Sequence, residues 1–280
     1  MFVYIALARL YLCRHGQTEN NRLHLVQGAR VDPPLNSNGH EQARRIGMAV
    51  TRLLENTGGN DAITGVPSLV AHSKMLRAKE TAQILTSTVD SSFSSSNPST
   101  SAPLKVYGEV PSLGEVDFGT LEGKDAKKVK SAMRKTFAAW SLGKIDTRPP
   151  GGEGESGREV LERAAAAIGI LGEIAVDSSA ASPSIMAVSH STYLRVLLSM
   201  AEDAPLLQSA LWKVQNGSIN IVDVNVEGKT RAVSMTSGMF GGGVLGGSPM
   251  TMKKERLDLV IPEVHLIRRN EVRHLEGMNV

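Results

Sequence analysis

Three predicted strands end in basic or protonatable residues. Arg14 and His15 follow the first strand, Arg77 lies shortly after the second, and His190 follows a buried strand near residue 188. In open α/β sheets, ligands bind beyond the carboxyl ends of the strands, where loops lead into helix N-termini that favour anions. Arginine suits such a site because its planar fork binds phosphate oxygens bidentately and stays charged. These residues therefore predict a phosphate-binding site.

A histidine flanked by cations could also act as a nucleophile toward phosphorus. The cations keep the pKa of His15 low enough for the free base to exist near neutral pH, and they offset charge in the transition state. Expelling an alkoxide needs a proton donor, for which Glu115 is the preferred candidate. Asp117 and Glu122 are competitors that spacing alone leaves open. Cys13 adjoins the pair but lies on a strand, where we expect a small buried side chain rather than a nucleophile.

The elements that position these residues alternate between strand-like and helix-like patterns. This alternation predicts an α/β fold, a three-layer sandwich with a mostly parallel central sheet flanked by helices. Helices are expected after residue 36, from residue 77 to 85, after the capping box formed by Ser156 and Glu159, and over 193–200. The predicted strands are the opening run up to residue 13 and residues 69–72, 185–188, 219–226 and 264–267.

Three stretches interrupt the alternation. Residues 86–103 are rich in Ser, Thr and Pro and predict a mobile surface insertion. Residues 236–252 are rich in Gly, Ser and Met, and their glycine run lacks the ending of a P-loop. Residues 124–135 place six basic side chains on a predicted helix, which indicates either a solvated face or a basic lid over the site. We expect residues 1–280 to form one domain, with surface insertions at 86–103 and 236–252.

The composition limits the classes of partner. The chain has 280 residues, a net charge of +3 and only 4% aromatic residues, a poor match to nucleic-acid binding but compatible with a small phosphorylated substrate. The single cysteine excludes an internal disulfide and favours a reducing compartment, and no apolar run reaches the ~20 residues that span a bilayer. We therefore expect a cytoplasmic protein without membrane or nucleic-acid partners. No cluster of His, Cys or carboxylate residues has zinc-ligand spacing, so we expect neither a metal nor a cofactor. Whether the protein is a monomer or a dimer stays open.

Several longer motifs occur in a fixed order along the chain. They are R-H-G-x-T-x-x-N at residues 14–21, S-x-x-L-R-A-x-x-T-A at 73–82, L-x-E followed by G-x-x-E-G at 113–123, G-E-S at 154–156 with Arg163 beyond it, and V-S-H at 188–190. Together they resemble the histidine phosphatase (phosphoglycerate mutase-like) superfamily, in the branch that contains fructose-2,6-bisphosphatase and broad-specificity phosphatases. The resemblance covers residues 10–275.

This resemblance implies a phosphoglycerate mutase-like fold and a role for each matched residue. His15 would become phosphohistidine while Glu115 protonates the leaving group, and Arg14, Arg77 and His190 would hold the transferring phosphoryl group. Near that group would lie, by the same resemblance, Asn21, Gln27 and Gly28. No metal is implied.

The chain departs from the family pattern at several points, which include Leu121 in place of the tryptophan common before the Glu-Gly pair and the insertions at 86–103 and 236–252. Ser191 replaces the glycine that usually follows the second histidine, so its side chain would narrow the pocket or add a hydrogen bond to the phosphate. The doubled Gly-Glu at 151–155 leaves the alignment ambiguous between Glu153 and Glu155. The spacing to Arg163 favours Glu155.

The leading hypothesis is a phosphomonoester hydrolase that acts on a small anionic metabolite, such as a sugar phosphate or a compound like fructose-2,6-bisphosphate. A mutase of the phosphoglycerate type is the alternative. The mutases compared carry a longer segment than residues 124–153 before the G-E-S motif, which favours hydrolysis here. A non-catalytic scaffold that binds phosphorylated ligands is the third hypothesis, but such a protein has no need of the acid Glu115.

Overall fold

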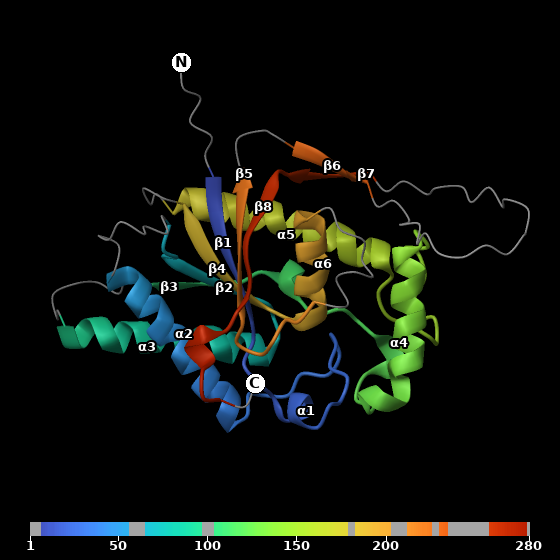
Figure 1. The fold of residues 1–280 in the computed structure, drawn as a ribbon, viewed down its shortest axis with the longest axis horizontal. Coiled ribbons are helices and arrows are strands. Elements are labelled where there is room, and N and C mark those ends of the chain that lie inside the picture. The colour runs from blue at the N-terminus through green and yellow to red at the C-terminus, as the bar shows by residue number, and fades with distance from the viewer. Residues whose placement is uncertain are drawn as a thin grey trace, which may run out of the picture.

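A computed structural model describes residues 7–55, 65–96, 104–178, 183–202, 212–225, 230–234 and 258–278. Its centre is a six-stranded sheet in the order β3-β2-β4-β1-β5-β8 (Figure 1). The pairings of β4 with β1 and β2, and of β2 with β3, are parallel, whereas β5 is antiparallel to β1 and β8. The predicted α/β fold with a mostly parallel sheet is therefore confirmed. The strands of this sheet are β1 (Leu7–Arg14), β2 (Leu69–His72), β3 (Lys105–Glu109), β4 (Ser184–Ser189), β5 (Ile219–Asn225) and β8 (Val264–Glu271).

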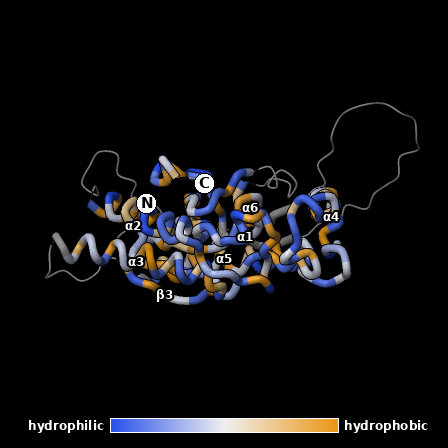
Figure 2. Tube along the Cα trace, turned by 90° about the horizontal axis from the view of Figure 1, so that it is seen from below, coloured by the Kyte–Doolittle hydropathy of each residue, from blue (hydrophilic) through white to orange (hydrophobic). Residues whose placement is uncertain are grey.

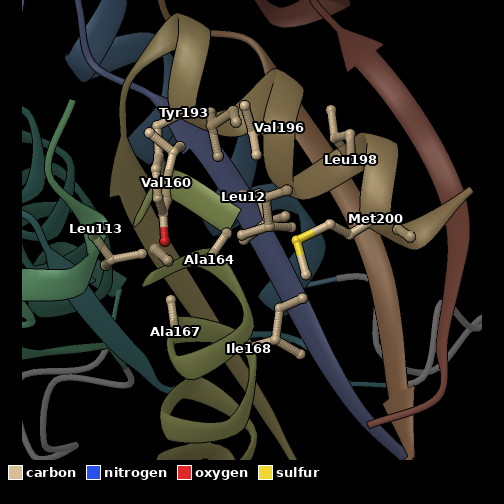
Figure 3. Close-up of a cluster of buried hydrophobic side chains, with 14 of the residues drawn as sticks. Leu12, Leu113, Val160, Ala164, Ala167, Ile168, Tyr193, Val196, Leu198 and Met200 are labelled. Atoms are coloured by element: carbon tan, nitrogen blue, oxygen red, sulfur yellow. The ribbon is translucent and has the colours of Figure 1, made fainter. Parts of the chain in front are cut away.

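Helices cover both faces of the sheet because its strands are apolar on both sides. Along β1, Leu10 and Leu12 belong to one buried cluster, and the alternating Tyr11 and Cys13 belong to another. Side chains of α5 (Gly157–Asp177) and α6 (Ser191–Ala201) belong to the first cluster and pack against β1, as Figure 3 shows. Side chains of α2 (Ser37–Glu55) and α3 (Leu76–Ser96) belong to the second cluster, on the opposite face of the sheet. This gives the three layers.

The remaining elements lie around this sandwich. Helix α4 (Ala126–Ser141) stands at the opposite end of the molecule from α2 and α3 in Figures 1 and 2. No helix within the described ranges is long and apolar enough to cross a bilayer. The smaller elements are α1 (Glu19–Arg22), the 3-10 turns η1 (Pro111–Leu113), η2 (Gly119–Leu121) and η3 (Arg273–Leu275), and a two-stranded sheet of β6 (Thr230–Ser234) and β7 (Asp258–Pro262).

Helix α3 is longer than predicted. The sequence predicted a helix to residue 85 followed by a mobile insertion at 86–103, but α3 continues to Ser96. Val89 is fully buried and Phe93 packs on the same cluster, so the apolar stripe of the helix continues past residue 85. The hydroxyls of Thr88 and Ser92 donate to backbone carbonyls four residues earlier, which satisfies them within the helix. Residues 97–103 and the predicted insertion at 236–252 lie outside the described residues.

Candidate active site

The carboxyl ends of β1, β2 and β4 meet at one edge of the sheet and bring the predicted residues together. Arg14 lies opposite Ser189 in the parallel register, so His15 and His190 leave adjacent strands at the same level. Their ring centroids are 5.1 Å apart. Arg77 comes from the first turn of α3, directly after β2, and its charge acts on both imidazoles.

His15 is held in one tautomer. Its Nδ1 lies 2.7 Å from the carbonyl oxygen of Gly16, and because a carbonyl only accepts, Nδ1 must carry the proton of this hydrogen bond. The lone pair is then on Nε2, which makes no hydrogen bond with the residues that the structure describes. Nε2 is therefore free to attack an electrophile.

Both imidazoles are kept neutral by their surroundings. His15 is 2% exposed and His190 is fully buried. Burial lowers the pKa of His15 well below its usual range, and the charges of Arg77 and Arg14 lower it further. Burial and the charge of Arg77 lower the pKa of His190 in the same way. The nucleophile is thus the free base at neutral pH.

A serine orients His190. Oγ of Ser73 and Nε2 of His190 are 2.6 Å apart, and Nδ1 of His190 is buried without a hydrogen-bond partner. The same hydroxyl accepts from the backbone N–H of Met75 at 3.3 Å, just before α3 begins at Leu76. Ser73 therefore links the second histidine to the start of this helix.

Arg77 is fully buried and fixed by backbone carbonyls. Its Nη1 donates to the carbonyl of Val31 and to the carboxylate of Asp32, each at 3.0 Å, and its Nη2 donates to the carbonyl of Gly28 at 3.1 Å. Burial lowers the pKa of Arg77, while the charges of Glu115 and Asp32 oppose that effect. Its Nε is buried and has no hydrogen-bond partner in the part of the chain that the structure describes, so one N–H of an oriented guanidinium remains available.

Two further arginines lie beside this group. Nη1 of Arg14 donates to the carbonyl of Val214 at 2.8 Å, and its Nε is buried without a partner. Burial, together with the charge of Arg195, lowers the pKa of Arg14 to about 10. Arg195 lies on α6, interacts electrostatically with Arg14 and Glu115, and also has a buried, unpartnered Nε. None of the sequence motifs includes Arg195, although its position five residues after His190 was a usable signal.

Four side chains of this region each have a buried nitrogen without a hydrogen-bond partner among the described residues. Buried polar groups in folded proteins nearly always have a hydrogen-bond partner, so donors left without one indicate a ligand that accepts hydrogen bonds. Three guanidinium groups favour an anion, and the oxygens of a phosphoryl group can accept from several donors at once. The three guanidinium donors are Nε of Arg14, Arg77 and Arg195, and the fourth nitrogen is Nδ1 of His190, which donates in the tautomer where the Ser73 hydroxyl gives its proton to Nε2.

Glu115 is held at the N-terminus of α6. Its Oε1 accepts hydrogen bonds from the backbone N–H of Tyr193 at 2.9 Å and of Val116 at 3.0 Å, whereas its Oε2, within the described residues, accepts one from the N–H of Thr192 at 3.3 Å. The side chain is 6% exposed and its charge acts on Arg14, Arg77 and Arg195. Oε2 is therefore the less engaged of the two oxygens among the described contacts.

The two competing acids have other partners. Asp117 pairs with Arg30 at 2.9 Å and accepts from the backbone N–H of Gly119. Glu122 accepts from three backbone N–H groups, those of Phe118, Arg30 and Val31. Both carboxylates are thus engaged in holding loops, which leaves Glu115 as the acid that the geometry favours.

An ion pair anchors the segment that carries Glu115. Glu155 binds Arg163 through both carboxylate oxygens, at 2.8 and 2.9 Å, and Arg163 donates to the carbonyl of Gly114 at 2.6 Å. Glu153 instead pairs with Arg30. The spacing to Arg163 favoured Glu155 over Glu153, and Glu155 is the glutamate that pairs with Arg163.

The predicted substrate-binding residues lie at the same edge. The Asn21 oxygen accepts from the backbone N–H of Thr18 and from Asn216, so its amide nitrogen is left to donate. Gln27 accepts from the Thr18 hydroxyl, and its Nε2 is buried without a partner. Ser191 opens α6 next to His190 and is half-buried, and its role in substrate binding stays a prediction.

Cys13 is placed as expected of a structural residue. Its side chain is fully buried between the helices and the sheet. Burial raises the pKa of the thiol to about 12, which keeps it protonated and unreactive at neutral pH.

Comparison with known proteins agrees with this geometry. Residues 10–236 match the family described as the histidine phosphatase superfamily (branch 1). The chain is 30% identical over 144 residues to fructose-2,6-bisphosphatase TIGAR B of Danio rerio, a match that covers 51% of this chain and 46% of that protein. It therefore spans less than half of that relative. It is also 27% identical over 223 residues to the probable phosphoglycerate mutase GpmB of Salmonella arizonae, covering 78% of this chain and 85% of that protein.

Solved structures share the fold. The phosphoglycerate mutase of Bacillus anthracis superposes with a TM-score of 0.60 at 22% identity, over 79% of this chain and 90% of that one. An α-ribazole-5'-P phosphatase from Escherichia coli, described as putative, superposes with a TM-score of 0.54 at 24% identity, over 78% of this chain and 91% of that one. At these identities the likeness shows the phosphoglycerate mutase-like fold alone.

Proposed function

This chain belongs to branch 1 of the histidine phosphatase superfamily, and from that premise we propose that it hydrolyses phosphomonoesters of small anionic metabolites, such as sugar phosphates, through a phosphohistidine at His15. One observation carries the proposal. Nδ1 of His15 donates to Gly16, which leaves Nε2 unprotonated and free beside four unpartnered nitrogens. A binding protein needs those donors, but it does not need a free nucleophile with Glu115 beside it.

The first half of the reaction follows from this arrangement. Nε2 of His15 attacks phosphorus, an N–P bond forms, and the P–O bond to the alcohol breaks. Oε2 of Glu115 gives its proton to the departing oxygen. The N–H groups of Arg14 and Arg77 and the imidazole of His190 stabilise charge on the other phosphoryl oxygens, and they are already fixed before the substrate arrives.

The second half reverses the roles. Water attacks phosphorus and gives a proton to the carboxylate of Glu115, the N–P bond breaks, and inorganic phosphate leaves. His15 returns to the neutral tautomer that Gly16 fixes. A phosphoryl group returned to another hydroxyl of the bound product would make the protein a mutase, as the name of the Salmonella arizonae relative suggests for that protein.

A panel of phosphorylated metabolites tests the proposal. Wild-type protein should release phosphate from at least one of them and should take up an acid-labile, base-stable phosphoryl label. His15→Ala should lose both, by about the 10⁶-fold that removal of a nucleophile has cost elsewhere. His40→Ala is the matched control, since His40 is an exposed histidine on α2 outside the site. If His15→Ala retains activity and label, the proposal is wrong, and interconversion of phosphoglycerates faster than phosphate release would identify a mutase.

A further inference from the structure

A second hollow lies on the α2 side of the sheet. Its volume is about 440 Å³, within the range of small-molecule sites. Its floor is apolar and comes from three strands, with Met186 of β4 and Ile219 and Ile221 of β5 beside Tyr11 of β1. Helix α2 forms one wall, and β8 with η3 forms the other. None of the five proposed catalytic residues is among the described residues that line it.

The rim of this hollow carries an excess of positive charge. Arg268 and Arg273 share one carboxylate, Glu271, at 3.5 and 3.0 Å. Arg52, in the last turn of α2, is exposed and has no ion pair within the described ranges. Burial lowers the pKa of His274, the other titratable group of the rim, so it adds no charge at neutral pH. Three guanidinium groups therefore face one carboxylate.

We propose that this hollow binds a small amphiphilic anion, with its carboxylate or similar headgroup at Arg52 and Arg273 and its apolar body on Ile219 and Ile221. Binding on the floor would remove the apolar body of the ligand from water, which is favourable. The rim offers its headgroup charge-assisted hydrogen bonds. A neutral apolar molecule would leave Arg52 without a partner, and a cation would meet net repulsion. The ligand class therefore follows from the pairing of the floor with the rim.

The site stands apart from the phosphatase chemistry. Most of the exposed arginines of the described surface are in ion pairs, such as Arg44 with Glu41 and Arg148 with Glu159. Arg52 and Arg134 have no ion pair within the described ranges. Arg134 lines a hollow made mostly of basic side chains of α4, whereas Arg52 lies at the edge of an apolar floor, where its charge can pair with the headgroup of an amphiphile.

Calorimetric titration of the full chain with sodium decanoate, below its micelle concentration, tests the proposal. We expect saturable binding of one decanoate per chain and at least tenfold weaker binding of decyltrimethylammonium, which has the same chain length and the opposite charge. Arg52→Gln should weaken decanoate binding at least fivefold. Ala49→Phe should weaken it at least tenfold by filling the hollow, since Ala49 is a half-buried residue of the α2 wall. Unchanged thermal unfolding and phosphate release would show that both variants are folded.

Two controls separate this site from other anion sites. Arg44→Gln removes an arginine of the same helix that does not line the hollow and should leave decanoate affinity within twofold. Arg77→Met removes the central cation of the catalytic site and should also leave it within twofold. The proposal is overturned if decanoate does not bind, if the cationic amphiphile binds equally well, or if Arg77→Met weakens binding while Arg52→Gln does not. Failure of the phosphatase panel would leave these outcomes unaffected.

Discussion

The two oxygens of Glu115 are not equivalent, and this difference matters for its role as the acid. Oε1 accepts two backbone hydrogen bonds at 3.0 Å or less, whereas Oε2 has one weak contact at 3.3 Å. Glu115→Gln keeps an acceptor for the α6 N-terminus but cannot donate a proton to a leaving alkoxide. We expect kcat for alkyl phosphates to fall by about 10²–10⁴-fold, and kcat for p-nitrophenyl phosphate to fall much less because its leaving group needs no proton. Equal losses on both substrates would exclude Glu115 as the acid.

Arg195 is placed to select among substrates. It interacts electrostatically with Glu115, the proposed acid, so we expect it on the side of the departing alcohol, and its buried Nε has no partner among the described residues. A substrate whose alcohol carries a second anionic group could satisfy it. Arg195→Met should therefore raise KM about tenfold or more for a bisphosphate or a phosphoglycerate, while KM for p-nitrophenyl phosphate stays within about threefold. Arg158→Met, at a surface ion pair on α5, is the control. A similar rise for both kinds of substrate would assign Arg195 to the phosphoryl site itself.

Glu122 holds the loop that carries Arg30 and Val31. Its carboxylate accepts from the backbone N–H groups of Arg30 and Val31, and the carbonyls of Gly28 and Val31 hold Arg77. Gly28 has no room for a side chain, because a Cβ there would lie 2.1 Å from Oε1 of Glu122. The position of the Arg77 guanidinium therefore depends on the loop, and the position of the loop depends on Glu122.

Glu122→Ala should loosen this loop and so weaken phosphate binding. Hydrogen bonds to a charged group contribute about 1.5–3 kcal/mol, so we expect inorganic phosphate to bind about tenfold or more weakly. Gly28→Ala, whose Cβ would collide with Oε1 of Glu122 and so displace this carboxylate, should have a similar effect. Glu153→Ala removes an exposed carboxylate that also pairs with Arg30 and should change phosphate affinity little. Unchanged affinity in Glu122→Ala would show that Arg77 holds its position without the loop.

The sequence was most informative about elements with a strong local pattern. The buried strand β4, the strand β2 and the capping box of Ser156 and Glu159 were predicted because apolar runs and capping residues act locally. Strand β3 was not predicted, since it is a mostly exposed edge strand without an apolar alternation. The Ser- and Thr-rich end of α3 was mistaken for an insertion because such a composition is typical of loops. In the structure, its hydroxyls donate to backbone carbonyls of the same helix, which composition alone does not reveal.

Long-range partners were the least predictable part of the site. The motifs identified His15, Arg77, Glu115 and His190, and the structure brings these residues together at one sheet edge. The contact of Glu122 with a loop about ninety residues earlier in the chain depends on tertiary packing that no local pattern encodes. The involvement of Arg195 likewise depends on which face α6 turns toward the site.

Folding places two histidines in an environment that excludes their charged forms, and this affects the stability of the whole molecule. The pKa of His15 and of His190 lies well below 6.5 in the folded state because of burial and the charge of Arg77. Above pH 6.5 both states leave these imidazoles neutral, and stability does not depend on them. Below pH 6.5 the unfolded chain binds protons that the folded chain does not, so the free energy of unfolding must fall as the pH falls toward the folded pKa values.

This linkage predicts a measurable slope between pH 6.5 and 5. Each of the two histidines can contribute up to about 1.4 kcal/mol per pH unit to the loss of unfolding free energy. Urea unfolding of His15→Asn at pH 5, 6 and 7 should show a slope smaller than that of the wild type by up to this amount, since asparagine does not titrate. His40→Asn should keep the wild-type slope, because His40 is exposed. Equal slopes for the wild type and His15→Asn would mean that His15 can be protonated in the folded protein, and Nε2 would then not be a free base at mildly acidic pH.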